Sequence, residues 1–217
     1  PATVPATVPA TVPATVHYKL THQNNSAHTI SFHPRFLILA GGFEDHSVIL
    51  YDISVSPPII YHHLKHHYEL VLCVVFHPNI PFFATCGMDN STILYNISMF
   101  TVSLKLLPTS SPHSLCSLLP PTIKCCLTDH TDKGSQVVFY EHRSLLATCS
   151  YDGTVIVYDI TILPPTIEYH LKDQISDDVL CIGFHPNLPL LMNGARNRIL
   201  YNIDRIQNKY QRLFHNL

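Results

Sequence analysis

The chain has 217 residues, of which 46% are hydrophobic and 13% are charged, and its formal net charge is -2. Such a composition excludes a disordered protein, and the lack of a basic excess argues against nucleic acid as a partner. The most apolar stretch, residues 70–86, is broken by His77 and by two prolines, so we expect no membrane span. The seven cysteines and the absence of a secretory signal predict reduced thiols in an intracellular, cytoplasmic protein.

Residues 1–16 consist of four copies of Pro-Ala-Thr-Val. Proline at every fourth position is too frequent for a segment that packs around a core, so the sequence predicts an extended, solvated tail or linker. A mucin-like stalk is the alternative. The folded region is expected to cover residues 17–217.

A longer repeat occurs four times after this tail. In the first three copies a phenylalanine precedes an alanine by eight residues, and an aspartate precedes a tyrosine by six. The fourth copy, from Phe184 to Tyr201, is two residues shorter and lacks the aspartate. The matched positions are Phe32, Phe76 and Phe139, Ala40, Ala84 and Ala147, Asp45, Asp89 and Asp152, and Tyr51, Tyr95 and Tyr158.

Each copy predicts short strands that are separated by turns. In the second copy, runs rich in β-branched and aromatic residues cover 71–76, 82–86 and 92–97, with turn residues between them. A Pro-Pro pair then precedes a further strand-like run, as at 59–61 and 166–169. In the second copy this pair comes 19 residues later than in its neighbours, which predicts an insertion around residues 99–118 between two strands of one unit. Four strands fit a unit of about 40–45 residues, the length of a β-propeller blade.

The pattern Phe-His-Pro, Leu-Ala-Thr-Cys-Ser-x-Asp-Gly-Thr and Tyr-Asp-Ile resembles the WD repeat over residues 17–217. The chain departs from that family in having no tryptophan, so tyrosines stand in its place, and no glycine precedes the histidine of the repeat. The resemblance implies an all-β fold of propeller blades with four antiparallel strands each, of which about four are visible. WD-repeat rings commonly have seven blades, which need about 300 residues. We therefore expect an incomplete propeller whose missing blades come from a longer chain, with a closed four-blade ring as the alternative.

The resemblance also implies a hydrogen-bonded set in each blade. It joins the histidine of the loop that leads into the blade, the aspartate of the central hairpin, a strand serine or threonine, and the residue at the tryptophan position. With four up-and-down strands, this lead-in loop and the central hairpin lie at the same edge. We expect a set looser than in a standard member, because tyrosine replaces tryptophan. The structural residues are His67, Asp89, Tyr95, His130, Asp152 and Tyr158.

Functionally, the resemblance implies a non-enzymatic scaffold that binds other proteins. The sequence contains no catalytic or nucleotide-binding motif, so we expect no catalytic residue and no cofactor, and the repeated histidines are expected to have structural roles and not to bind a metal. The lead-in loops and central hairpins would form one face with a mildly acidic and aromatic character, suited to a basic peptide. Its candidate interaction residues are Glu44, Asp45, His46, Tyr68, Glu69, Asp132, Tyr151, Asp177 and Asp178.

Two other interpretations remain open. Sixteen histidines raise the possibility of a metal-binding or enzymatic propeller, although those of the Phe-His-Pro turns and lead-in loops recur as repeat features, and the cluster at 62–67 would share one face only in a helix. The cysteines at matched strand positions, Cys73 with Cys181 and Cys86 with Cys149, are expected to be small buried apolar groups. The remaining interpretation is a degenerate, non-functional gene product.

Overall fold

The described residues form fifteen β-strands in four antiparallel sheets, one for each copy of the repeat. The computed structural model describes residues 18–20, 25–98, 120–172, 178–195 and 198–204. The Pro-Ala-Thr-Val tail and the insertion at 99–118 lie outside the described residues, so their predicted conformations stay predictions. The prediction of an all-β propeller built of four-stranded blades is confirmed for the first three copies, and the fourth copy has three described strands.

The strands follow the chain order within every sheet. Blade 1 contains β1 (Ala27–Phe32), β2 (Ile38–Phe43), β3 (Val48–Asp52) and β4 (Ile59–Leu64). Blade 2 contains β5 (Val71–Phe76), β6 (Phe82–Gly87), β7 (Thr92–Asn96) and β8 (Thr122–Leu127). Blade 3 contains β9 (Gly134–Tyr140), β10 (Leu145–Ser150), β11 (Thr154–Asp159) and β12 (Thr166–Lys172). Blade 4 contains β13 (Cys181–Phe184), β14 (Leu190–Gly194) and β15 (Leu200–Asn202).

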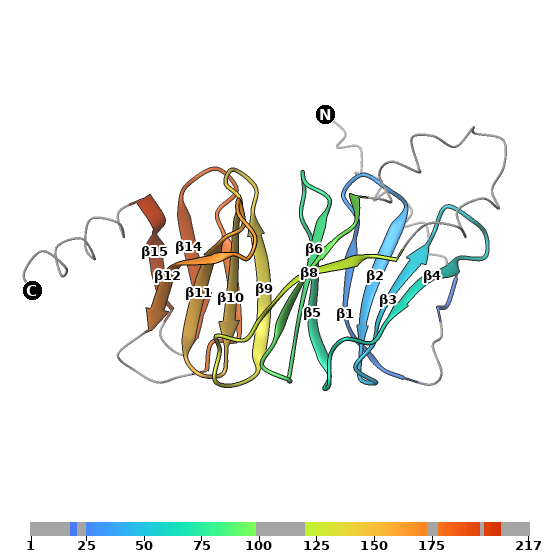
Figure 1. Ribbon diagram of the computed structural model, residues 1–217, viewed down its shortest axis with the longest axis horizontal. Coiled ribbons are helices and arrows are strands. Elements are labelled where there is room, and N and C mark those ends of the chain that lie inside the picture. The colour runs from blue at the N-terminus through green and yellow to red at the C-terminus, as the bar shows by residue number, and fades with distance from the viewer. Residues whose placement is uncertain (1–17, 21–24, 99–119, 173–177, 196–197, 205–217) are drawn as a thin grey trace, which may run out of the picture.

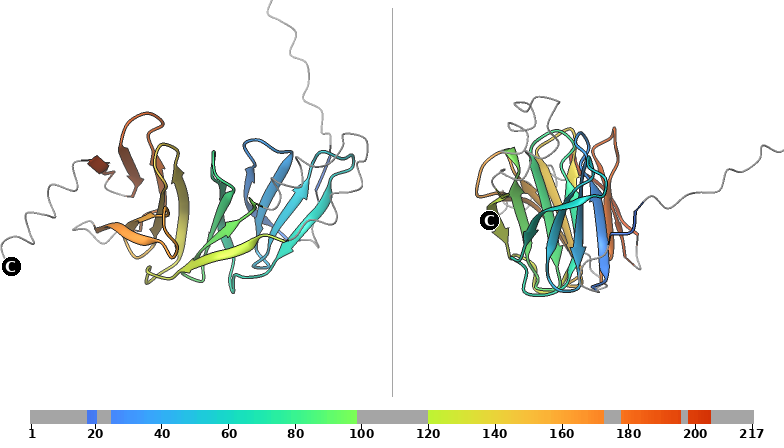
Figure 2. Two further views of the ribbon diagram at one scale, coloured as in Figure 1. Left: turned by 45° about the horizontal axis from the view of Figure 1, so that its top comes forward. Right: turned by 90° about the vertical axis from the view of Figure 1, so that its right-hand side faces the viewer.

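The four sheets stand side by side in chain order (Figure 1), and the left view of Figure 2 shows them as a row of separate, twisted blades. The first strands form the inner row: β1 contacts β5, β5 contacts β9, and β9 contacts β13. Among the described elements, the outer strands β4, β8 and β12 have substantial contacts only with the third strand of their own sheet. Sheets that touch along their first strands and separate at their fourth strands are arranged radially, as the blades of a propeller are.

The strand register repeats from blade to blade. The repeat tyrosine always lies opposite a large hydrophobic residue of the second strand: Leu39 opposite Tyr51, Phe83 opposite Tyr95, Leu146 opposite Tyr158, and Leu191 opposite Tyr201. In blade 2 the two rings of this pair stack with centroids 4.5 Å apart and planes 7° apart. The insertion joins β7 to β8, which pair within one sheet, as the sequence predicts.

The hydrophobic core lies between the blades. Three clusters of buried side chains fill the three interfaces, so both faces of blades 2 and 3 are covered. This explains the near-continuous apolar runs of β6, β7, β10 and β11, because a strand that is covered on both faces has no polar side to alternate with. The largest side chains with less than 2% exposure are Tyr95, Tyr158, Phe83, Ile49, Leu50, Leu94, Ile97, Leu146, Ile156, Leu191 and Ile203.

Blade 4 presents one face that no described blade covers. Met192 and Leu200 are 46% and 60% exposed, whereas Ala84 and Leu94 at the same positions of blade 2 are fully buried. Cys181 lies on this face and is exposed. The prediction that all the matched cysteines are buried is therefore wrong for Cys181, because no described segment covers this face of blade 4. No described helix is long and apolar enough to cross a membrane.

Candidate interaction site

In blade 2 a single carboxylate connects the lead-in loop to the central hairpin. Asp89 Oδ2 lies 2.9 Å from His67 Nδ1 and accepts the Tyr68 backbone N–H at 2.9 Å. Asp89 Oδ1 accepts the Ser91 backbone N–H at 3.1 Å and its hydroxyl at 2.7 Å. Burial alone would raise the pKa of Asp89, but the hydrogen bonds from His67, Ser91 and Tyr68 lower it well below its usual value. The carboxylate is therefore ionised and holds both loops in place.

Blade 3 repeats this arrangement. Asp152 Oδ2 lies 3.1 Å from His130 Nδ1 and accepts the Thr131 N–H at 2.9 Å, and Asp152 Oδ1 accepts the Thr154 N–H and hydroxyl at 2.9 and 2.6 Å. Burial again opposes ionisation of Asp152, and the hydrogen bonds from Thr154 and Thr131 again lower its pKa. Both histidine–aspartate contacts that the sequence predicts are present.

Each histidine also reaches a threonine on the second strand. His67 Nε2 lies 2.7 Å from Thr85 Oγ1, and His130 Nε2 lies 2.8 Å from Thr148 Oγ1. Burial lowers the pKa of His130 despite the nearby Asp152, so this ring is neutral. A neutral ring that donates from Nδ1 to the carboxylate accepts the threonine hydroxyl at Nε2. The lead-in loop, the hairpin and the second strand are thus joined through one imidazole.

The tyrosines take partners that the sequence analysis missed. Tyr158 donates its hydroxyl to Asp129 Oδ2 at 2.9 Å, and the Tyr95 hydroxyl lies 3.1 Å from His66 Nδ1. Burial raises the pKa of both tyrosines, and Asp129 adds to the rise at Tyr158, so both hydroxyls stay protonated.

The chain departs from the family pattern in two ways: tyrosine stands in place of tryptophan, and a side chain stands in place of glycine before the repeat histidine. These two departures therefore compensate for each other. Asp129 and His66 directly precede the repeat histidines, where the WD repeat has glycine. A glycine there would offer the tyrosine hydroxyl no side-chain acceptor. Each link in the two sets has an ordinary hydrogen-bond length, and each of these tyrosine hydroxyls has a side-chain partner. That the set is looser than in a standard member of the family stays a prediction.

The end blades keep only parts of this set. Blade 1 has Gly41 at the threonine position, where an added Cβ would lie 2.9 Å from the Phe43 ring, so a side chain there would require this ring to shift. Its hairpin is still capped, since Asp45 Oδ1 accepts the Ser47 hydroxyl at 2.5 Å. Blade 4 has the buried Asn193 at the threonine position, and its Oδ1 accepts the Ile199 N–H at 2.8 Å.

The central hairpins share one backbone feature. Their second residue has a positive φ in the first three blades: 70° at His46, 63° at Asn90 and 79° at Gly153. This left-handed conformation suits glycine and is tolerated by asparagine. The three central hairpins therefore have the same type of backbone conformation at their second residue.

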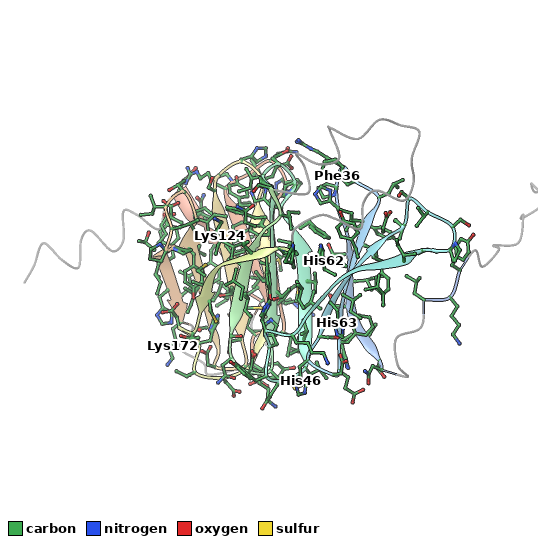
Figure 3. The ribbon with its side chains drawn as sticks, turned by 45° about the vertical axis from the view of Figure 1, so that its right-hand side comes forward. Phe36, His46, His62, His63, Lys124 and Lys172 are labelled. Atoms are coloured by element: carbon green, nitrogen blue, oxygen red, sulfur yellow. The ribbon has the colours of Figure 1, made fainter. Side chains whose placement is uncertain are left out.

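The predicted interaction residues that the structure describes all lie in these lead-in loops and hairpins, which form the loop rim. Figure 3 places His46 at this rim. Tyr68 is 85% exposed, Glu44, His46, Glu69, Asp132 and Asp178 are exposed, and Asp45 and Tyr151 are partly exposed. Asp177 lies outside the described residues. Lys65, Lys133 and Lys172 stand in or beside the same loops, so the rim is only mildly acidic.

The opposite rim consists of the Phe-His-Pro turns. His33 Nδ1 accepts two backbone N–H groups, from Arg35 and Phe36, both at 3.0 Å. His77 and His185 accept the equivalent pairs at 3.0–3.1 Å. Burial lowers the pKa of His33 and of His77 to about 4, and Arg35 adds to the effect at His33. His33 and His77 are therefore neutral turn acceptors.

Among the described residues, no three histidine, cysteine, aspartate or glutamate side chains are grouped so that they could hold a metal ion. The histidines of residues 62–67 do not share one face: His66 and His67 bind Tyr95 and Asp89, while His63 is exposed on β4. Cys86 and Cys149 are fully buried, as the sequence predicts, and Cys73 is half-buried.

Comparison with known proteins agrees with this geometry. The family model described as "WD domain, G-beta repeat" matches residues 59–96 and 122–159. Each match begins on the outer strand of one blade and continues into the next strands of the chain. The fold is similar to the crystal structure of Saccharomyces cerevisiae Sqt1, with a TM-score of 0.66 and 14% identity over 82% of this chain and 46% of that chain. At this identity the likeness shows the fold alone, and the chain spans less than half the length of Sqt1. No curated protein matches the sequence.

Proposed function

The chain is a WD-repeat protein with a row of β-propeller blades, and on that premise we propose that it is a non-enzymatic scaffold that binds another protein through its loop rim. WD repeats generally serve as platforms for protein binding. The observation that supports this role is the pair of carboxylates, Asp89 and Asp152, each of which connects a lead-in loop to a hairpin. A rim whose loops are fixed before binding loses less conformational entropy when a partner binds.

The partner we propose carries a basic segment. Glu69, Asp132 and Asp178 project from three successive lead-in loops and are exposed to solvent, and Tyr68 adds a large aromatic surface beside them. Exposed charges of one sign raise the rate at which a partner of opposite charge associates, and aromatic side chains supply the contact area. The described cysteines are all free, which fits our proposal of a reducing, intracellular location.

The test compares proteins captured by the full chain and by a variant with Glu69→Lys, Asp132→Lys and Asp178→Lys. We expect the reversal to remove captured proteins, and the capture to weaken with rising salt. Glu141→Lys is the matched control, because this exposed carboxylate lies beside the turns of the opposite rim. An unchanged set of captured proteins in the triple variant, or an equal loss in the control, would contradict the proposal.

A further inference from the structure

The rim formed by the Phe-His-Pro turns, opposite the loop rim, contains a pocket of about 250 Å³ in blade 1. It lies between the turn that joins β1 to β2 and the segment that joins β3 to β4. Phe36, Tyr61, Asp52 and Arg35 are among its lining residues. Figure 3 labels Phe36 at this rim, on the side of the molecule opposite His46. The pocket is thus separate from the loop rim.

Asp52 has a structural role that uses only one of its oxygens. Its Oδ1 accepts the backbone N–H and the hydroxyl of Ser54 at 2.8 and 2.5 Å, which caps the turn after β3. In blade 2, Asn96 Oδ1 caps the same turn by accepting the Ser98 N–H at 2.6 Å. An uncharged side chain therefore suffices for the turn, and the charge of Asp52 is not needed for it.

The second oxygen of Asp52 is buried and, among the described residues, has no hydrogen-bond partner. The whole residue is only 3% exposed, whereas Asp159 at the same position of blade 3 is partly exposed. A buried carboxylate oxygen without a donor is costly, because it has lost its water and gained nothing in return. An oxygen in this state at a pocket favours a ligand that brings a donor.

The walls of the pocket are specific to blade 1. Phe36 and Tyr61 are replaced by Ile80 and Lys124 at the matched positions of blade 2, and by Arg143 and Glu168 in blade 3. Aromatic faces beside a carboxylate favour a cation, since the ring faces and the carboxylate are both electronegative.

Arg35 does not supply that cation. Its guanidinium donates to Asn79 Oδ1 of blade 2 at 3.0 Å, in a contact that is exposed to solvent. Water and salt screen an exposed charge much more than a buried one. The charge of the buried Asp52 carboxylate is therefore screened less than that of Arg35.

We propose that this pocket binds one cationic side chain, a lysine or an arginine, of a partner protein. Its volume of about 250 Å³ is below the roughly 300–1,000 Å³ of small-molecule sites, which suits a single side chain. The ammonium or guanidinium group donates to Asp52 Oδ2, and the aliphatic stem lies against Phe36 and Tyr61. This site is separate from the loop rim, and the proposal does not depend on the function proposed for that rim.

The experiment titrates the full chain with capped pentapeptides Gly-Gly-X-Gly-Gly, where X is lysine, arginine or norleucine, followed by ligand-observed NMR. We expect saturable binding of the lysine or arginine peptide, and none of the norleucine peptide, which has a similar stem without the charge. Asp52→Asn should weaken the binding about tenfold or more, through the loss of one charge-assisted hydrogen bond. This variant should fold, because asparagine already caps the same turn at Asn96.

Two further variants complete the test. Asp159→Asn is the matched control, since it removes the equivalent charge in blade 3, and it should leave the binding unchanged. Phe36→Ile introduces the residue of blade 2 and should also weaken the binding, which decides the question if Asp52→Asn fails to fold. The proposal is overturned if neither cationic peptide binds, if norleucine binds equally well, or if both Asp52→Asn and Asp159→Asn have the same effect.

Discussion

Replacing Tyr158 with phenylalanine removes one oxygen atom from a side chain that is only 1% exposed. That oxygen donates to Asp129 Oδ2 at 2.9 Å. Hydrogen bonds to charged groups contribute about 1.5–3 kcal/mol, and the lower end applies because Asp129 itself is exposed and its oxygens can return to water. We expect Tyr158→Phe to lower the free energy of unfolding by about 1.5 kcal/mol.

The assay is a double-mutant cycle in urea. Tyr158→Phe, Asp129→Ala and the double variant are unfolded at pH 7, and the coupling energy is taken from the three differences. We expect a coupling of about 1 kcal/mol, since each single change removes the same hydrogen bond. Tyr68→Phe is the control and should have no effect, because the Tyr68 side chain is 85% exposed. A coupling below about 0.3 kcal/mol would refute the idea that the two departures from the family pattern compensate for each other.

Three further outcomes are expected. Asp89→Ala should lower the free energy of unfolding in urea by about 3 kcal/mol or more, since it leaves a buried imidazole and two backbone donors without their acceptor. The control Asp132→Ala should hardly change this free energy. Similar losses in the two variants would contradict the role of the buried carboxylate. The pKa of His33 and of His77 is lowered to about 4 in the folded chain, so on acidification the histidines of the unfolded chain are protonated first. The free energy of unfolding should therefore be at its full value above about pH 6.5 and should fall towards pH 4, by at most about 1.4 kcal/mol per pH unit for each ring. His77→Asn keeps an acceptor in the turn and should flatten this slope, and an unchanged slope would count against a neutral histidine in the turn. Gly153→Ala should lower the melting temperature by an amount equivalent to about 1–2 kcal/mol, because φ at this residue is 79°, and an unaltered temperature would be inconsistent with that backbone.

The sequence was sufficient to predict the blades because the repeat preserves spacing. The interval of eight residues from phenylalanine to alanine spans the hairpin between the first two strands, as from Phe76 on β5 to Ala84 on β6. The interval of six residues from aspartate to tyrosine runs from the turn of the next hairpin into its second strand, as from Asp89 to Tyr95 on β7. Fixed hairpin lengths set the register, and register decides which side chains share a face. The contact between His67 and Asp89 was predictable for the same reason, since up-and-down strands bring both loops to one edge.

Other features depend on three-dimensional contacts that spacing does not encode. The hydroxyl of Tyr158 on β11 reaches Asp129, which lies 29 residues earlier in the chain, in the loop that leads into the blade. One signal was available in the sequence: a polar residue precedes the histidine in both copies where glycine is expected, and both copies have tyrosine for tryptophan. The exposure of Cys181 and the burial of Asp52 could not be predicted, because they depend on which surface covers each blade.

Amide hydrogen exchange tests the central claim, that each copy of the repeat folds as one antiparallel blade whose middle strands are paired on both sides. In blade 2, β6 and β7 each have a partner on both sides, whereas β8 pairs only with β7 among the described strands and so has one free edge there. We predict that the amides of β6 and β7 exchange at least about tenfold more slowly than those on the free edge of β8, and that β10 and β11 behave alike in blade 3. Exchange of β6 and β7 at the rate of an unfolded chain, or equal protection across all four strands, would contradict this architecture.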